Sequence, residues 1–185
     1  MARLSPKEFW ALSKAKRKVL VAKDILKQIE TKKYDLRNMG WLNLPDNITE
    51  EKAAEIDLYK NFSKVGTCTV CELGACILSI GHLGNNLNLL EATAIGGFDK
   101  PGTKAKKLIV KVFTPKEVWF LEACFEDGSS QVGKQVGYER TVKDIYIAEA
   151  FHDSFLNGKE RAITIAKNII RNKGKFIPSQ DIKKA

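Results

Sequence analysis

The stretch from residue 67 to residue 83 reads TCTVCELGACILSIGHL, and it decides the fold. Between Leu73 and Ile80 the residues are apolar on nearly all sides, which is typical of a helix enclosed by other elements. The segment Thr69–Glu72 has the pattern of a capping box, so we expect this helix to begin near Val70. Gly74, in its first turn, allows another element to approach closely.

Further helices are predicted on both sides of this stretch. The segment Ser5–Glu8 combines an N-cap, a proline at the first helical position and a capping-box glutamate, and the segment Thr114–Glu117 repeats that pattern. Thr141 has the position of another N-cap, Gly158 that of a helix stop and Gly174 that of a C-terminal stop. We expect helices over residues 5–31, 49–59, 70–83, 115–126, 141–158 and 159–172.

The remaining segments read as loops, with one strand candidate. Residues 108–113 (LIVKVF) are the best candidate, although no partner strand is evident. Residues 34–47, 84–107 and 128–139 are polar or rich in Gly, Pro and Asn, with one helical turn expected around residues 89–92. The predicted fold is therefore mainly α: a single-domain bundle of about five to six helices, with at most a small β element near 108–113. Its predicted core includes Leu73, Ala75, Ile77, Phe151, Ile165 and Ile169.

Length and composition fit one folded domain over residues 1–185. Hydrophobic residues make up 44% and charged residues 29% of the chain, both ordinary for a globular protein. No stretch reaches the roughly 18 apolar residues that a membrane span needs. The N-terminus lacks the apolar segment of a secretory signal. We therefore expect a cytoplasmic protein with no membrane partner.

The net charge of +9 is concentrated at the two ends of the chain. Residues 1–33, the basic N-terminal helix, hold ten Lys or Arg and three acids. Residues 159–185, the basic C-terminal helix and tail, hold eight Lys or Arg and two acids. The core region between them, residues 34–158, has more acids than bases. This asymmetry suits a partner with an acidic surface, either protein or nucleic acid.

Both basic segments have one apolar stripe, so their cations are expected on the outward faces. In the first segment, Phe9, Leu12, Val19, Ala22, Leu26 and Ile29 recur at helical spacing. If the two helices pack side by side, their outward faces merge into one positive surface. If they pack on opposite sides, the charge is dispersed and only aids solubility. The expected centre of a merged surface is Lys14, Arg17, Lys18, Lys167 and Arg171.

The four cysteines allow three interpretations. Cys68 and Cys71 form a C-x-x-C motif at a helix start, where the helix dipole lowers a thiol pKa and would favour redox chemistry. A zinc site with Cys76 and Cys124 is disfavoured, because Cys71 and Cys76 lie about 140° apart around one helix. The third interpretation treats all four as small buried hydrophobes. We expect no bound metal and no cofactor.

Other catalytic signatures are missing from the sequence. It has no G-x-x-x-x-G-K-[ST] and no G-x-G-x-x-G phosphate-binding motif. His82 lies eleven residues after Cys71 on the same expected helix, roughly 16 Å away, so the two cannot form a Cys–His pair. No carboxylate pair stands out. These observations favour a non-enzymatic protein with no catalytic residues.

Three segments resemble a group of small uncharacterised bacterial and phage proteins. Residues 71–75 (CELGA) resemble the Cys-x-x-Gly-Ala helix start of that group, and residues 140–145 (RTVKDI) resemble the helix start that follows it. Residues 160–178 are similar to the C-terminal ends of tailed-phage proteins. The resemblance implies a phage or mobile-element setting and carries no functional residue over.

Taken together, these patterns predict a non-enzymatic accessory protein of a phage or mobile element. It would bind and modulate a host or defence component, in the host cytoplasm, through the basic surface. One alternative is a nucleic-acid-binding protein that uses the same surface. A second alternative is a thiol-redox or zinc-binding domain that uses Cys68 and Cys71.

Overall fold

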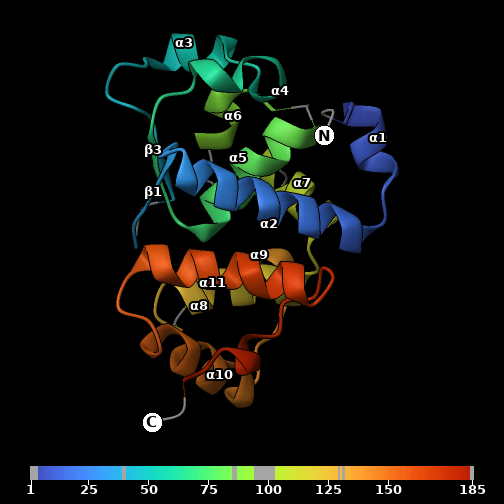
Figure 1. Cartoon of the computed structure of the whole chain (residues 1–185), viewed down its shortest axis with the longest axis vertical. Helices are drawn as coiled ribbons and strands as arrows, with labels where there is room; N and C mark the ends of the chain where they lie inside the picture. The colour runs from blue at the N-terminus through green and yellow to red at the C-terminus, as the bar shows by residue number, and fades with distance from the viewer. Residues whose placement is uncertain are drawn as a thin grey trace.

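The computed structural model describes residues 4–38, 41–84, 87–93, 103–128, 130 and 132–183. These residues form a mainly helical fold, as predicted (Figure 1). The α-helices are α1 (Pro6–Ala11), α2 (Lys14–Glu30), α3 (Glu50–Glu55), α4 (Leu58–Asn61), α5 (Glu72–Gly84), α6 (Leu89–Thr93), α7 (Lys104–Val112), α8 (Pro115–Phe125), α9 (Val132–Val136), α10 (Val142–Asp153) and α11 (Gly158–Arg171). Two 3-10 helices, η1 (Phe62–Lys64) and η2 (Pro178–Gln180), and three short strands complete the described part. The eleven α-helices in these ranges exceed the five to six expected, because two expected helices are each broken in two, two expected loops contain α6 and α9, and the expected strand belongs to α7.

Helix α5 is the centre of the fold. It packs against α1, α2, α4, α6, α7 and α8, and every residue from Glu72 to Gly81 is buried. The prediction of an enclosed helix is therefore confirmed. The helix begins at Glu72 rather than near Val70, because residues 68–70 are used in a strand. Cys71 makes the transition: its N–H donates to the carbonyl of Trp41 at 3.1 Å and its carbonyl accepts the N–H of Ala75 at 2.9 Å.

A three-stranded sheet leads into α5. Strand β3 (Cys68–Val70) lies in the middle, parallel to β1 (Tyr34–Leu36) and antiparallel to β2 (Leu42–Asn43). Residues 34–47, which were expected to be a loop, supply both outer strands. The strands are only two or three residues long and are recognised by their pairing, so the local sequence gave little signal for them.

The capping signals located most helix starts correctly. Ser5, Thr114 and Thr141 each form a complete capping box with the acid three residues later. Gly174 ends α11 with a φ of +94°, and its N–H donates to the carbonyl of Ile169 at 2.8 Å. Gly158 does not stop the preceding helix; it is the first residue of α11, which Asn157 caps.

The prediction of a strand at residues 108–113 is wrong, because this segment belongs to α7. Thr103 caps the helix, accepting a hydrogen bond from the N–H of Lys106. The buried side chains are Ala105, Leu108, Ile109 and Val112, whose spacing of three and four residues is helical. The apolar run is so short that a strand and a helix fit it equally well. Only the helical spacing that continues back to Ala105 distinguishes the two.

Two expected helices are broken in the structure. The first becomes α1 and α2, because Ser13 interrupts the helix and starts a new one by accepting the N–H of Lys16. The second, expected over residues 49–59, becomes α3 and α4, and Asp57 caps α4. In addition, the expected loop 128–139 contains α9. The expected turn near residues 89–92 is confirmed as α6, while residues 94–102 of that expected loop lie outside the described part.

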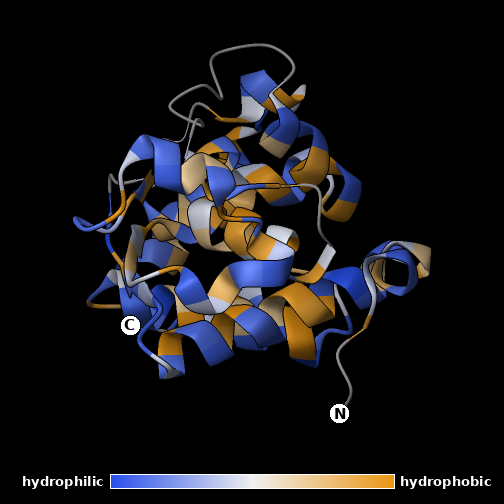
Figure 2. Cartoon of the chain, turned by 90° about the horizontal axis from the view of Figure 1, so that it is seen from above, coloured by the Kyte–Doolittle hydropathy of each residue, from blue (hydrophilic) through white to orange (hydrophobic). Residues whose placement is uncertain are grey.

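The core is one connected cluster around α5 and α8. All six residues predicted to be core are at most 1% exposed. Trp119 of α8 is the largest fully buried side chain, and its Nε1 donates to the carbonyl of Ser130 at 3.1 Å. In Figure 2 the hydrophobic segments gather toward the middle of the molecule. Among the described residues, no helix combines the length and the hydrophobicity that crossing a bilayer requires.

Candidate functional site

The two basic helices lie side by side. Helix α11 packs along α2, with their axes next to each other across the front of the molecule (Figure 1). The end of α11 sits tightly against the start of α2, because a Cβ on Gly174 would lie 2.4 Å from the carbonyl oxygen of Ala15. Of the two arrangements that the sequence left open, the structure has the adjacent one.

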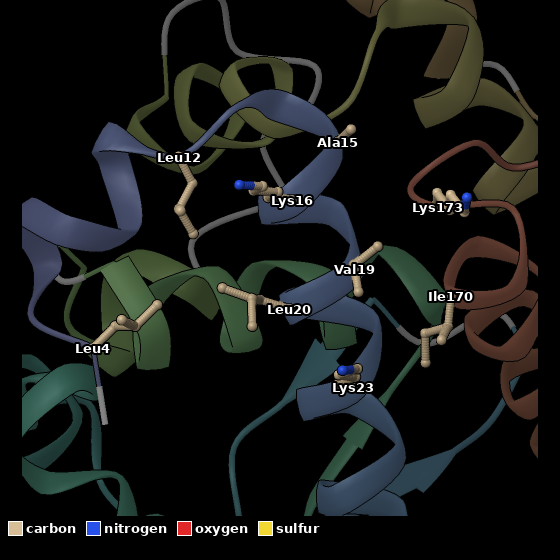
Figure 3. A pocket seen from close by; sticks show the side chains of 9 residues that line it. All are labelled: Leu4, Leu12, Ala15, Lys16, Val19, Leu20, Lys23, Ile170 and Lys173. Atoms are coloured by element: carbon tan, nitrogen blue, oxygen red, sulfur yellow. The ribbon is translucent and has the colours of Figure 1, made fainter. Parts of the chain in front are cut away.

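An open groove lies over the outer face of α2 at this junction. Its residues come from the segment around α1 (Leu4, Leu12), from α2 (Ala15, Lys16, Val19, Leu20, Lys23) and from the end of α11 (Ile170, Lys173), and we call it the α2 groove. Figure 3 shows α2 running between Leu4 and Leu12 on one side and Ile170 and Lys173 on the other. The cavity volume is about 480 Å³, and its lining is almost entirely apolar.

The register of α2 explains why apolar side chains face outward here. The buried stripe of α2 runs through Lys18, Val21, Ala22, Ile25 and Ile29. Val19, which was expected to be core, is only half-buried and belongs to the groove, as does Leu12. The break at Ser13 restarts the helix in a different phase from α1, so one continuous stripe from Phe9 to Ile29 does not exist.

Three lysines surround the apolar floor of the α2 groove. Lys16, Lys23 and Lys173 are exposed, and none has an acidic partner within the described residues. Lys16 and Lys23 are seven residues apart on α2, which places them on the same face, about 10 Å apart along the axis. The groove therefore combines apolar surface with uncompensated positive charge, two features that attract an acidic partner with an apolar side.

The residues predicted for the basic surface have other positions. Lys18 is 7% exposed and forms an ion pair with Glu117 of α8, with 2.6 Å between Nζ and Oε1. This ion pair connects α2 to α8, and Lys18 is not a surface cation. Arg17 places its guanidinium 5.3 Å from the centre of the Trp10 ring, and Lys14 Nζ lies 3.4 Å from the carbonyl oxygen of Val110.

The two predicted cations of α11 also differ from each other. Arg171 pairs with Asp181, with 2.8 Å between Nη2 and Oδ2, so its charge is largely compensated by the C-terminal segment. Lys167 is exposed on α11 but does not line the groove. Charge density alone does not single out Lys16, Lys23 and Lys173, the three lysines that line the groove. The available signal was the apolar pair Val19 and Leu20 between two lysines at heptad spacing.

All four cysteines are free and buried. Burial raises the pKa of Cys68 to about 11, although the charge of Lys33 acts in the opposite direction. Burial also raises the pKa of Cys71, and it outweighs the N–H groups of Gly74 and Leu73 that face the thiol at the helix start. The expected lowering of the Cys71 pKa is therefore wrong in sign. Removing water destabilises the thiolate more than the N–H groups at the helix start stabilise it. This arrangement favours the interpretation of the cysteines as small buried hydrophobes.

We expect none of these thiols to react with an aromatic disulfide reagent in native buffer, because thiolate formation requires local unfolding. In denaturant, four equivalents should react. The measurement is the release of the coloured thiol over time, with free cysteine as reference. Native labelling of Cys68 or Cys71 at the rate of free cysteine would restore the thiol-redox alternative.

Two glutamates with raised pKa values are further titratable features, Glu72 fully buried and Glu122 partly buried. Glu72 is fully buried, neither of its carboxyl oxygens has a hydrogen-bond partner, and burial raises its pKa to about 8. Glu122 has a pKa raised by burial to about 7, although it accepts a hydrogen bond from the Ser130 hydroxyl. Neither group lines the α2 groove. Among the described residues, no group of three or more His, Cys, Asp and Glu side chains is placed to hold a metal ion.

His82 forms a polar pair with a carboxylate inside the fold. Its Nδ1 lies 3.1 Å from Oδ1 of Asp24, and its ring stacks on Phe62 with 4.1 Å between ring centres. Ser79, one turn earlier on α5, is fully buried, and its hydroxyl is hydrogen-bonded to that of Tyr34 at 3.1 Å. A serine nucleophile needs a hydroxyl that substrate can reach, so this cluster reads as packing of α5 against α2.

A second hollow, between α8, α10 and the C-terminal segment, has a cavity volume of about 540 Å³. Its central group is Asp144, which accepts hydrogen bonds from Tyr138 at 2.6 Å, Lys116 at 2.9 Å and Thr141 at 2.7 Å. Partial burial would raise the pKa of Asp144, but the bonds from Tyr138 and Lys116 outweigh it and lower that pKa. The buried charge of this hollow, Asp144, is therefore paired with Lys116, in contrast to the lysines of the α2 groove.

In comparisons with known proteins, no family model, no curated protein and no solved structure matches the chain.

Proposed function

We propose that the chain is a non-enzymatic binding protein whose working surface is the α2 groove. The observation that carries the proposal is an apolar groove over α2, with three lysines that have no acidic partner among the residues that the structure describes. Apolar side chains that are partly exposed and grouped on one surface are typical of interaction sites. The fitting partner is a protein segment with apolar side chains on one face and acidic side chains beside them.

The structure supports this choice over the two alternatives named from the sequence. Nucleic acid presents phosphates to cations and does not need an apolar floor for its backbone, whereas the α2 groove is lined mainly by Leu4, Leu12, Val19, Leu20 and Ile170. Thiol or zinc chemistry at Cys68 and Cys71 is disfavoured by burial and by the raised thiol pKa values. In the phage or mobile-element setting that the sequence resemblance implies, the partner would be a host or defence component.

The test is selection of binders from a random peptide library on the immobilised protein. Peptides that bind the wild type should combine apolar and acidic residues, and Val19→Asp should weaken their binding about ten-fold or more. Val19 is half-buried and is not among the side chains packed on the core, so the variant is expected to fold. The added carboxylate both removes apolar contact and repels acidic peptides.

The matched control is Val142→Asp, the same substitution at a valine that is 67% exposed on α10, outside the groove. It should leave peptide binding unchanged. Selected peptides that bind wild type and Val19→Asp equally would contradict the proposal. So would tight binding of a duplex oligonucleotide with a steep salt dependence, together with a failure to select peptides.

A further inference from the structure

We infer that the occupant of the α2 groove is an amphipathic helix that carries two acidic residues seven positions apart. This inference rests on the proposed function and specifies its partner. It follows from the spacing of the lysines, from the shape of the exposed face of α2 and from the lack of polar backbone partners in the groove.

The exposed face of α2 has an ordered charge pattern. Ala15, Val19 and Lys23 form one row with a spacing of four residues, and Lys16 and Leu20 begin the adjacent row. Such rows are the ridges between which a second helix packs. Lys16 lies at one end of the apolar strip and Lys23 at the other, so the strip is apolar in its middle and positive at both ends.

The length of this strip matches two turns of a helix. From Ala15 to Lys23 the axis advances about 12 Å. Helices bound in grooves use anchors at positions i, i+3 or i+4, and i+7, which advance about 10 Å. An acid at each end of such a set would meet Lys16 and Lys23, with two apolar anchors between them over Val19 and Leu20. Lys173, from the end of α11, can receive a third acid on the flank of the bound helix.

The groove wall also favours a helix over an extended segment. An extended peptide leaves backbone N–H and C=O groups that require a sheet edge or other polar partners. The α2 groove has no strand among its lining residues, most of which belong to α2 and α11, and its surface is nearly all apolar apart from the three lysine ammonium groups. A helix satisfies its own backbone hydrogen bonds and therefore loses little on entering such a groove.

The experiment uses synthetic helices, stapled on the face away from the groove, and the full-length protein. The test peptide has two glutamates seven residues apart with two leucines between them on the same face. The control peptide has the same composition, with the glutamates five residues apart, so that one points about 140° away. Affinities are measured by fluorescence anisotropy. The test peptide should bind at least about ten-fold more tightly, a difference that corresponds to 1.4 kcal/mol.

Charge reversal on the protein tests whether Lys16 and Lys23 pair with the acids of the peptide. The double variant Lys16→Glu/Lys23→Glu should bind the test peptide about ten-fold or more weakly than the wild type does. A peptide with lysines in place of the two glutamates should bind this variant and not the wild type. The control is Lys134→Glu/Lys143→Glu, which changes the net charge equally at exposed lysines of α9 and α10. It should bind the test peptide like the wild type.

Equal affinity for the two peptide spacings, or no rescue by the lysine peptide, would overturn the inference. Binding of decanoate in competition with library-selected peptides, without binding of the helix, would also overturn it and would indicate a small amphiphile. These failures are distinct from failure of the proposed function. Library peptides that depend on Val19 but lack the helical seven-residue spacing would leave the binding function in place.

Discussion

Glu72→Gln is expected to raise the free energy of unfolding at pH 8 by up to about 5 kcal/mol, while changing it little at pH 4.5. The folded pKa of Glu72 is raised to about 8, and the unfolded chain has the ordinary value of 4.5. Between these values the unfolded state has lost the proton that the folded state keeps. The unfolded state then binds fewer protons, so stability falls as pH rises from about 4.5 to 8 and is constant above that.

The magnitude follows from the size of the shift. Each unit of pKa difference corresponds to about 1.4 kcal/mol, and the conversion applies because Glu72 is fully buried. Glutamine keeps the shape and removes the ionisation, so its advantage over glutamate should grow with pH. Chemical denaturation at several pH values measures it, with Glu50→Gln on the exposed face of α3 as control. Parallel pH profiles of wild type and Glu72→Gln would show that Glu72 reaches water or a cation in solution.

Gly74→Ala is expected to destabilise the fold by about 3 kcal/mol or more. In an ordinary helix this substitution would stabilise by about 1 kcal/mol, because alanine has the higher helix propensity. Here an added Cβ would lie 2.0 Å from the carbonyl oxygen of Trp41. The same oxygen accepts the N–H of Cys71, so it cannot move away without losing the bond that joins β2 to the start of α5. Steric overlap with backbone therefore decides the sign.

The thermal midpoint measures this effect. For a chain of this size, 3 kcal/mol corresponds to a decrease of roughly 6–12 °C. The control is Gly137→Ala, where an added Cβ meets nothing within 4 Å and only the φ of +77° is strained. It should cost about 1 kcal/mol. A Gly74→Ala variant as stable as the wild type would mean that the Trp41 carbonyl does not lie against the first turn of α5.

The sequence predicted those features of the fold that have local causes. Capping boxes at Ser5, Thr114 and Thr141 are complete within four residues, and each starts a helix in the structure. The uniformly apolar stretch after Glu72 could only be an enclosed helix, because no exposed face was available to it. The features that were predicted wrongly depend on partners that are distant in the sequence. Strand β3 exists because β1 and β2 pair with it, and residues 108–113 are helical because α5 and α8 accept their apolar face.

The candidate site was predicted only in part. The charge asymmetry indicated two helices that lie side by side in the structure, so a shared surface is geometrically available. The individual cations were misjudged because charge density does not reveal which lysine has an acidic neighbour. Lys18 meets Glu117, almost one hundred residues away in the chain, and becomes buried. Lys16 and Lys23 meet no such acid in the described part of the chain, and the apolar surface between them became visible only with the true register of α2.

The most direct test of the central claim is the map of backbone amide chemical-shift changes when a library-selected peptide is added to the isotope-labelled protein. We expect changes concentrated in residues 12–23 and 170–173, the two segments that contain eight of the nine residues lining the α2 groove, and a loss of these changes in Val19→Asp. Changes concentrated instead around Lys116 and Asp144, in the hollow between α8 and α10, would contradict it and place the working surface at the other end of the molecule.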